Sequence, residues 1–318
     1  DAYVALAMAA TVTDHIELAP GVTNSVTRSA AVTASAIASV DRVSKGRAVL
    51  GIGRGDSALA HLGRAPGRVA HFERYLRHVQ SYLRGESVPF DEVDIAEAIA
   101  PSMSELEMAD APPDSRIGWL VGSPKVPVEV AASGPRVIGV AARQADRVVL
   151  AMGADPERLS WGIEVAKQAR RDAGLDPDDI AFGAYIQCAT HPDTAVAREL
   201  VRGGSTTFAR FSIMQGTTAG PMDAEQKKVL EDVRENYDMK AHTRGDSRQA
   251  GALTEQFLDK FSVIGSSQHC VERLQEIIGL GITRLIITSV GRSTADDQSE
   301  RARELFEREV LPAIGLRA

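Results

Sequence analysis

One stretch decides the fold: residues 47–57 read Arg47-Ala48-Val49-Leu50-Gly51-Ile52-Gly53-Arg54-Gly55-Asp56-Ser57. Its apolar first half is typical of a strand that is buried on both faces of a sheet. Its second half is a turn in which glycine backbone lets a ligand approach and Arg54 offers a fork of donors suited to phosphate. The stretch does not complete the dinucleotide-binding pattern, because Ala58 stands where the third glycine is needed.

The same alternation of apolar run, polar turn and helical pattern recurs along the chain, which predicts an α/β fold with a parallel sheet and crossover helices. The expected strands are 15–22, 47–53, 126–132, 147–152, 180–189 and 283–290. Helical stripes are expected at Val69, Phe72, Leu76, Val79 and Leu83, and again at Val271, Leu274, Ile277 and Ile278. A further helix is expected over 2–12. Segments 86–122 and 203–265 interrupt this alternation of strands and helices and are interpreted as insertions.

Composition narrows the classes of function. The 318 residues are 44% hydrophobic and carry a formal net charge of -7, so we expect no attraction to nucleic acid. No apolar stretch is long enough for a membrane helix, and a cytoplasmic location is expected. The two cysteines, Cys188 and Cys270, lie far apart in unlike contexts and are interpreted as reduced thiols. The histidines show no metal-ligand spacing and are interpreted as surface residues.

Polar residues follow the expected strands. Thr23 and Asn24 follow the first strand, where short side chains suit the edge of a planar heterocycle, although a simple turn explains them equally well. Asp56 is the only acid in the glycine-rich turn and is a candidate for proton transfer. An N-cap of the helix that follows is the alternative role for Asp56.

Two later strand ends favour an anion site. Ser133 and Gly134 precede a helix whose N-terminus can bind a phosphate. Met152 and Gly153 end the next strand, and Gly153 leaves room for close approach of a ligand to the backbone. Helix capping without any ligand is the alternative interpretation of both loops.

Several of these motifs together resemble the luciferase-like monooxygenase superfamily, over the whole chain and in the family's order. The motifs are Gly21-Val22-Thr23-Asn24-Ser25-Val26-Thr27-Arg28, Ser44-Lys45-Gly46-Arg47, Gly51-Ile52-Gly53-Arg54-Gly55-Asp56, Ala131-Ala132-Ser133-Gly134-Pro135-Arg136 and Ala145-Asp146. The resemblance implies a (β/α)₈ TIM barrel that binds FMN or the deazaflavin coenzyme F420. It also implies a single domain over 1–318, with the family's first strand, first helix and second strand preceding Asp1.

The resemblance also implies roles for individual residues. Gly21 and Val22 are joined by a non-prolyl cis peptide that supports the flavin ring, and Thr23 and Asn24 contact that ring. Ser133, Gly134 and Gly153 hold the cofactor phosphate. Arg54 lies where some FMN-dependent members place a phosphate-binding arginine, and Asp56 corresponds to a proton-transferring acid of some F420-dependent members.

The function expected from these features is hydride transfer between F420 and a small organic substrate. The alternatives are an FMN-dependent monooxygenase, favoured by Arg54, and a non-catalytic flavin-binding barrel. A phosphosugar isomerase or lyase is disfavoured, because only Glu129 and Lys125 lie near a strand end and neither is well placed. We expect a homodimer or higher homo-oligomer without nucleic-acid or membrane partners.

Overall fold

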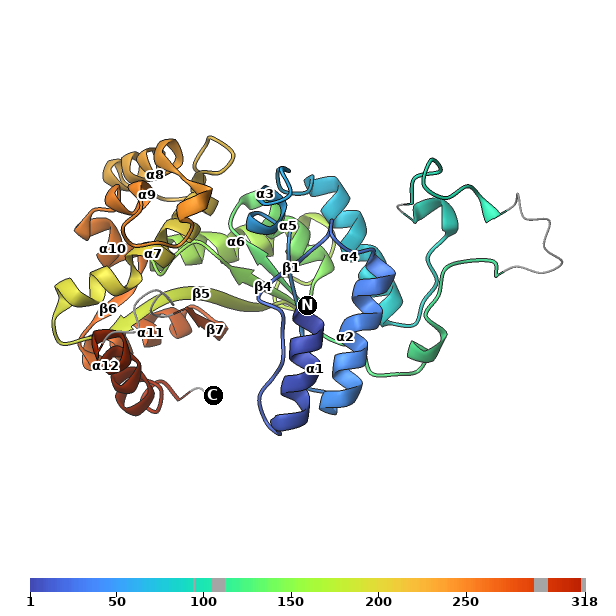
Figure 1. Ribbon diagram of the computed structural model, residues 1–318, viewed down its shortest axis with the longest axis horizontal. Helices are drawn as coiled ribbons and strands as arrows, with labels where there is room; N and C mark the ends of the chain where they lie inside the picture. Colours follow the sequence, from blue (N-terminus) through green and yellow to red (C-terminus); the bar gives the residue numbers. More distant parts are fainter. Residues whose placement is uncertain (94, 104–111, 289–296, 316–318) are drawn as a thin grey trace. The chain divides into compact units, whose positions relative to one another are not determined.

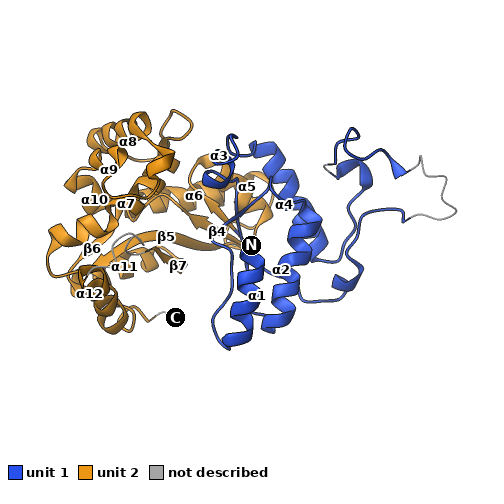
Figure 2. Ribbon diagram, viewed as in Figure 1, with its two compact units in different colours: residues 1–129 blue, residues 130–318 orange. Residues whose placement is uncertain are grey.

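The protein forms two compact units in a computed structural model, which describes residues 1–93, 95–103, 112–288 and 297–315. Unit 1 comprises residues 1–129 and unit 2 comprises residues 130–318 (Figure 2). The boundary falls within strand β3 (Val128–Ala132). Each unit is an arrangement of parallel strands and helices, as the alternating sequence pattern predicts. No helix in the described ranges is long and apolar enough to cross a membrane.

Unit 1 places two short parallel strands beside three longer helices (Figure 1). Its elements are α1 (Ala2–Val12), β1 (Thr23–Asn24), α2 (Ala30–Ser44), β2 (Leu50–Gly53), α3 (Ser57–Ala60), α4 (Val69–Leu83) and the short helical turns η1 (Phe90–Glu92) and η3 (Gly118–Leu120). The expected stripe on α4 is confirmed, because Phe72, Leu76, Val79 and Leu83 are buried. Both α1 and α4 pack against α2.

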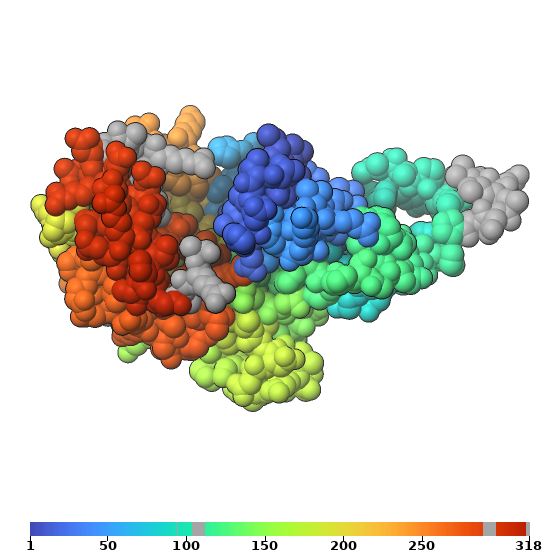
Figure 3. Space-filling view, turned by 90° about the horizontal axis from the view of Figure 1, so that it is seen from below, coloured from blue at the N-terminus to red at the C-terminus, as the bar shows by residue number. Residues whose placement is uncertain are grey.

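Arg47 holds the end of α1 in place. Its guanidinium donates to the carbonyl oxygens of Ala10 (3.1 Å), Thr13 (2.7 Å) and Ile16 (2.8 Å), to the Thr13 hydroxyl (3.0 Å) and to the Ser44 carbonyl (2.9 Å). Ala10 lies in the last turn of α1 and Thr13 is its C-cap, so one arginine satisfies carbonyls that have no partner within the helix. Three apolar side chains of α1 are exposed, at Val4, Met8 and Val12. Figure 3 shows the N-terminal helix in dark blue at the surface of the molecule.

Unit 2 is built around the long strand β5 (Ala181–Thr190), which pairs in parallel with three neighbours: β4 (Arg147–Leu150), β6 (Val263–Gly265) and β7 (Ile282–Thr288). Its helices are α5 (Pro135–Gln144), α6 (Pro156–Asp172), α7 (Thr194–Ile213), α8 (Ala224–Asn236), α9 (Arg248–Gly251), α10 (Glu255–Phe261), α11 (Ser267–Gly279) and α12 (Asp297–Leu305), with the turns η4 (Met239–Ala241) and η5 (Phe306–Val310). The apolar stripe of α11 is confirmed for Val271, Leu274 and Ile277, which are buried.

The structure corrects two strand predictions. The first strand, expected over 15–22, is β1 at Thr23–Asn24. Leu18 makes only an isolated bridge to Ala48, and Pro20 has no N–H to extend the pairing. Strand β6 was missed, because three residues within a polar segment give no periodic signal. The last strand ends at Thr288, and residues 289–290 of that prediction lie outside the described residues.

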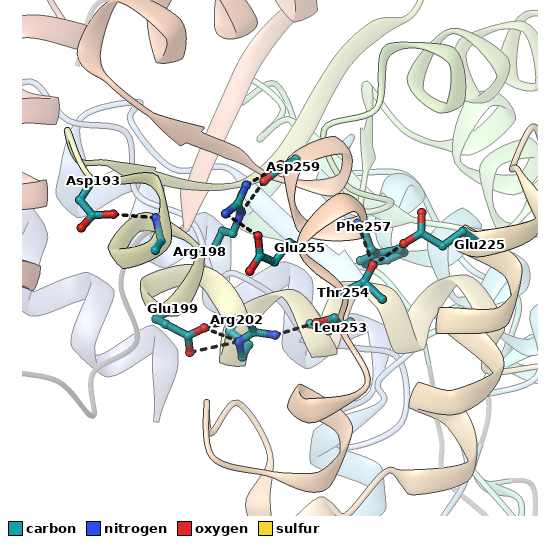
Figure 4. Close-up of polar contacts among 11 residues, drawn as sticks. Asp193, Arg198, Glu199, Arg202, Glu225, Leu253, Thr254, Glu255, Phe257 and Asp259 are labelled. Atoms are coloured by element: carbon teal, nitrogen blue, oxygen red, sulfur yellow. Dashed lines mark hydrogen bonds and ion pairs between the residues drawn. The ribbon is translucent and has the colours of Figure 1, made fainter.

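The insertion predicted from residue 203 starts later than expected, because α7 continues without a break to Ile213. The rest of the segment includes α10, which packs against α7 through ion pairs (Figure 4). Arg198 donates to both carboxylate oxygens of Asp259 (2.8 Å each) and pairs with Glu255 at 2.7 Å. Arg202 donates to the Leu253 carbonyl at 2.7 Å. These contacts fix the position of α10.

The last residue of α10 touches the loop that follows β4. The Ala154 amide donates to the Phe261 carbonyl at 2.8 Å. Gly153 has a φ of +89°, and a Cβ there would lie 2.6 Å from the Phe261 ring. Only glycine suits such a position, since side chains avoid both this backbone conformation and this distance. The glycine is therefore explained by the approach of Phe261.

Replacing Arg47 with Met should destabilise unit 1 by about 3 kcal/mol, because the carbonyls at the end of α1 lose a charged donor. Urea unfolding followed by circular dichroism gives the free energy of unfolding. Arg64→Met is the matched control, since Arg64 is exposed, and it should change this free energy by less than about 0.5 kcal/mol. Equal effects of the two substitutions would contradict the role of Arg47.

Replacing Gly153 with Ala should cost about 3 kcal/mol, the sum of a left-handed backbone and a clash with Phe261. Gly174→Ala is the control, because Gly174 also has a positive φ (+70°) but nothing lies within 4 Å of its Cβ position. It should cost only about 1 kcal/mol in thermal or urea unfolding. If both variants lost the same free energy of unfolding, the close contact between Gly153 and Phe261 would contribute nothing to the cost of the substitution.

Candidate functional site

The strand ends of unit 1 bring four predicted site residues to one edge. Thr23 is in register with Ile52, and Asn24 with Gly53. Because parallel strands end at the same edge, Arg54 and Asp56 follow β2 beside the end of β1. The structure thus groups Thr23, Asn24, Arg54 and Asp56 within unit 1.

Gly51 permits β2 to lie directly against the segment before β1. A Cβ at Gly51 would lie 2.2 Å from the Pro20 carbonyl oxygen. The sequence interpretation assigned the alternating glycines to a ligand, but at Gly51 the close neighbour is the protein's own backbone. The glycine is needed to bring the two chain segments together.

The Gly21–Val22 peptide bond is cis, as the family resemblance implies. Val22 is 42% exposed, which is unusual for a valine beside a buried strand. Its side chain offers an apolar surface next to Thr23, directly before β1. Its contact with a ring stays a prediction.

Asn24 shapes the turn after β1. Its side-chain oxygen accepts from the amides of Val26 (2.9 Å) and Thr27 (3.0 Å), and its Nδ2 donates to the Thr27 hydroxyl at 3.0 Å. These bonds match the turn that the sequence left open as an alternative. A contact of Asn24 with a ring remains a prediction, and the side chain is buried.

Arg54 and Asp56 differ in their local roles. The Arg54 Nε donates to the Gly67 carbonyl at 2.7 Å, which closes the loop between β2 and α4. Asp56 stands at the N-cap position of α3, but its side chain makes no capping hydrogen bond. The N-cap alternative for Asp56 therefore finds no support in the hydrogen bonds of α3.

In unit 2, the strand ends form a second group of predicted residues. The Ala151 amide donates to the Ala132 carbonyl at 2.8 Å, so the ends of β3 and β4 lie side by side. Gly134 is the N-cap of α5, which has no side-chain cap, and nothing lies within 4 Å of a Cβ built on Gly134. The Ser133 hydroxyl donates to the Phe211 carbonyl at 3.3 Å. The N-terminus of α5 therefore has open space in front of it.

Met152 and Gly153 face the interior of unit 2. Met152 is fully buried, and its terminal methyl group packs 3.2 Å from the Cβ position of Gly162 on α6. Phe261 occupies the space beside the Gly153 Cα. Only backbone atoms of these two residues can take part in ligand binding, and that role stays a prediction.

The sequence missed a hollow in unit 1. It has a volume of about 400 Å³ and is lined by residues 25–31, by four aromatic side chains of α4 and by Val93, Ile95 and Ser115; the α4 residues are His71, Tyr75, His78 and Tyr82. Their spacing of three and four residues, which marks one face of a helix, was the available signal. Burial raises the pKa of Tyr75 to about 12, so this hydroxyl keeps its proton near neutral pH.

The assignment of all histidines to the surface is wrong for two of them. His78 is buried and lies 3.0 Å from a Glu92 carboxylate oxygen. His191 is also buried, and its Nδ1 accepts from the Asp193 amide at 3.1 Å. The Nε2 of His78 and the Nδ1 of His191 thus have local polar partners, as buried polar groups usually do. Among the described residues, no group of three or more ligating side chains could hold a metal ion.

Comparison with known proteins gives relatives along nearly the whole chain. The chain is 26% identical over 318 residues to 5,10-methylenetetrahydromethanopterin reductase of Methanolobus tindarius, covering 98% of this chain and 87% of the relative.

Solved structures share the fold. The coenzyme F420 dependent tetrahydromethanopterin reductase from Methanopyrus kandleri matches with a TM-score of 0.68 and 23% identity, over 99% of this chain and 88% of that one. An F420-dependent secondary alcohol dehydrogenase in complex with an F420-acetone adduct matches with a TM-score of 0.70 and 16% identity, over 99% and 84%. The predicted fold class is confirmed by these likenesses. The family model described as luciferase-like monooxygenase matches residues 1–284, and the chain therefore belongs to the luciferase-like monooxygenase family.

Proposed function

We propose that this protein is an F420-dependent oxidoreductase that transfers a hydride between the coenzyme and a small organic substrate. The observation that carries the proposal is the register of β1 with β2, which pairs Asn24 with Gly53, so that the loop carrying Asp56 starts at the edge where Thr23 and the exposed Val22 lie. The family and the F420-dependent relatives support it. When bound, the coenzyme supplies the hydride chemistry, and the residues of the chain bind, orient and handle protons.

In unit 1, three residues have roles toward the ring. Val22 gives an apolar surface for a planar heterocycle, and the Thr23 hydroxyl reaches the ring edge. Asp56 transfers a proton at the substrate or the ring, a role open to a carboxylate at the end of a strand. Asn24 keeps the turn that carries these groups in shape through its bonds to Val26 and Thr27.

In unit 2, the N-terminus of α5 binds the phosphate of the coenzyme. The amides of a helix's first turn have no partner within the helix and favour an anion. The space at Gly134 supports this site, because nothing apart from its own neighbours in the chain lies within 4 Å of its Cβ position. The Ser133 hydroxyl and the Gly153 backbone complete the proposed set.

The second candidate is an FMN-dependent monooxygenase. Arg54 favours it as a phosphate-binding arginine, whereas its bond to the Gly67 carbonyl gives the guanidinium a local role in closing the loop. A non-catalytic flavin-binding barrel is the candidate from another class. A cytoplasmic homodimer or higher homo-oligomer, formed by a single domain over 1–318, belongs to the same proposal.

Separate titrations with F420 and FMN distinguish these candidates. We expect micromolar affinity for F420 and weaker affinity for FMN, measured by fluorescence or calorimetry. Tighter binding of FMN would favour the monooxygenase, and micromolar binding of neither would contradict the proposal. Binding without turnover would favour the non-catalytic barrel. Turnover is measured from the visible absorption of oxidised F420, with isopropanol or methylenetetrahydromethanopterin as test substrates.

Two substitutions test the assigned roles separately. Asp56→Asn should lower turnover by about 10²-fold or more, because the proton carrier is lost, and leave F420 affinity nearly unchanged. Gly134→Val should weaken F420 binding by about tenfold or more, because the added side chain fills the phosphate space. Its backbone (φ -112°, ψ 153°) suits valine, so the fold should persist.

The control for Asp56→Asn is Asp14→Asn, since Asp14 is exposed and lies outside the proposed site. It should leave both turnover and affinity unchanged. Unchanged turnover in Asp56→Asn would refute the proton-transfer role, and unchanged F420 affinity in Gly134→Val would refute the phosphate site at α5.

A further inference from the structure

The two cysteines of the chain meet in unit 2. The sequence interpretation placed Cys188 and Cys270 in unrelated contexts, and the structure corrects this. Cys188 lies on β5 and Cys270 in the first turns of α11, and each thiol shifts the pKa of the other. Both are free and buried, with 1% and 0% of their surface exposed. They form a dithiol pair inside one unit.

The register of the sheet explains this meeting. Cys188 is opposite Val263, and Thr190 is opposite Gly265 at the end of β6. Helix α11 starts at Ser267, directly after β6, and it contacts both β6 and β5. The Cys270 thiol donates to the Gly265 carbonyl at 3.6 Å. The pair is thus held by elements adjacent in the sheet.

The two thiols differ in acidity. The hydrogen bond from Cys188 lowers the pKa of Cys270, and Thr190 acts in the same direction. The same thiol–thiol bond, with burial, raises the pKa of Cys188 well above its ordinary value. A position near a helix N-terminus also favours a thiolate at Cys270. In the closed structure the Cys270 thiol keeps its proton for the bond to the Gly265 carbonyl. When that turn opens, Cys270 is the more acidic thiol of the pair and therefore its nucleophile.

A hollow borders the turn that carries Cys270. It has a volume of about 910 Å³, and its lining includes Gly265, Ser266 and His269, the residues around Cys270 in sequence. Cys270 itself is fully buried, so a small neutral oxidant in this hollow reaches the sulfur only when the first turn of α11 opens locally. Such local openings require far less free energy than global unfolding.

We propose that Cys188 and Cys270 are a redox-active pair that forms a disulfide when the protein meets a peroxide. The Cys270 thiolate attacks one oxygen of hydrogen peroxide, the O–O bond breaks, and a sulfenic acid and one water form after proton uptake. The Cys188 sulfur then attacks the Cys270 sulfur, the S–O bond breaks, and a second water leaves. Two thiols are oxidised by two electrons, and one peroxide is reduced to two waters.

Peptide mass spectrometry tests the proposal on the full chain without any variant. The reduced protein is treated with hydrogen peroxide, blocked with iodoacetamide under denaturing conditions and digested with trypsin. We expect both free thiols to be lost, the intact mass to fall by two hydrogen atoms, and peptides 172–198 and 261–273 to be joined. A thiol reductant should restore both peptides. Two thiols that stay alkylatable, or oxygen added to either cysteine without a cross-link, would overturn the proposal.

Single substitutions assign the two roles. In Cys188→Ser, we expect peroxide to leave a sulfenic acid on Cys270 that dimedone traps. In Cys270→Ser, Cys188 should stay alkylatable under the same treatment. The opposite pattern would overturn the assignment of Cys270 as the nucleophile, and the wild-type measurement decides on the disulfide even if a variant fails to fold.

Discussion

The close approach of the Pro20 carbonyl to Gly51 is the constraint on which the strand-end edge of unit 1 depends. With only 2.2 Å between that oxygen and a Cβ position, any side chain at 51 would push β2 away from the chain before β1. The register of Thr23 with Ile52 depends on that contact, and Asp56 follows β2 in the next loop. The absence of a Cβ at Gly51 thus allows the close packing that positions the polar residues at the ends of β1 and β2.

Parts of the fold that repeat a pattern could be predicted from the sequence. The stripe on α4 and the apolar runs of β2 to β5 were found because burial imposes a period or a continuous run. Strand β6 escaped, since three residues carry no period. Strand β1 was displaced, because the apolar run before it contains Pro20, whose lack of an N–H prevents the pairing that the run suggests.

The candidate site was predictable in location but less so in the role of each residue. Strand ends were recognisable from their glycines and small polar residues, and the family resemblance named Gly21, Val22 and Ser133. For Asn24 the sequence left a turn and a ring contact equally open, because the same short side chain suits both. It could not reveal that Phe261 faces Gly153. That contact joins residues that are distant in sequence and follows from tertiary packing, as does the meeting of Cys188 with Cys270.

The packing of Phe261 on Gly153 also bears on how members of this family could exchange parts. The segment from α8 to α10 looks like a removable module, yet its last aromatic ring needs a glycine more than a hundred positions earlier in the chain. A chimera that received this segment without the matching glycine would inherit a steric conflict at a strand end. Recombination would therefore tend to keep the two positions together, as one inherited pair.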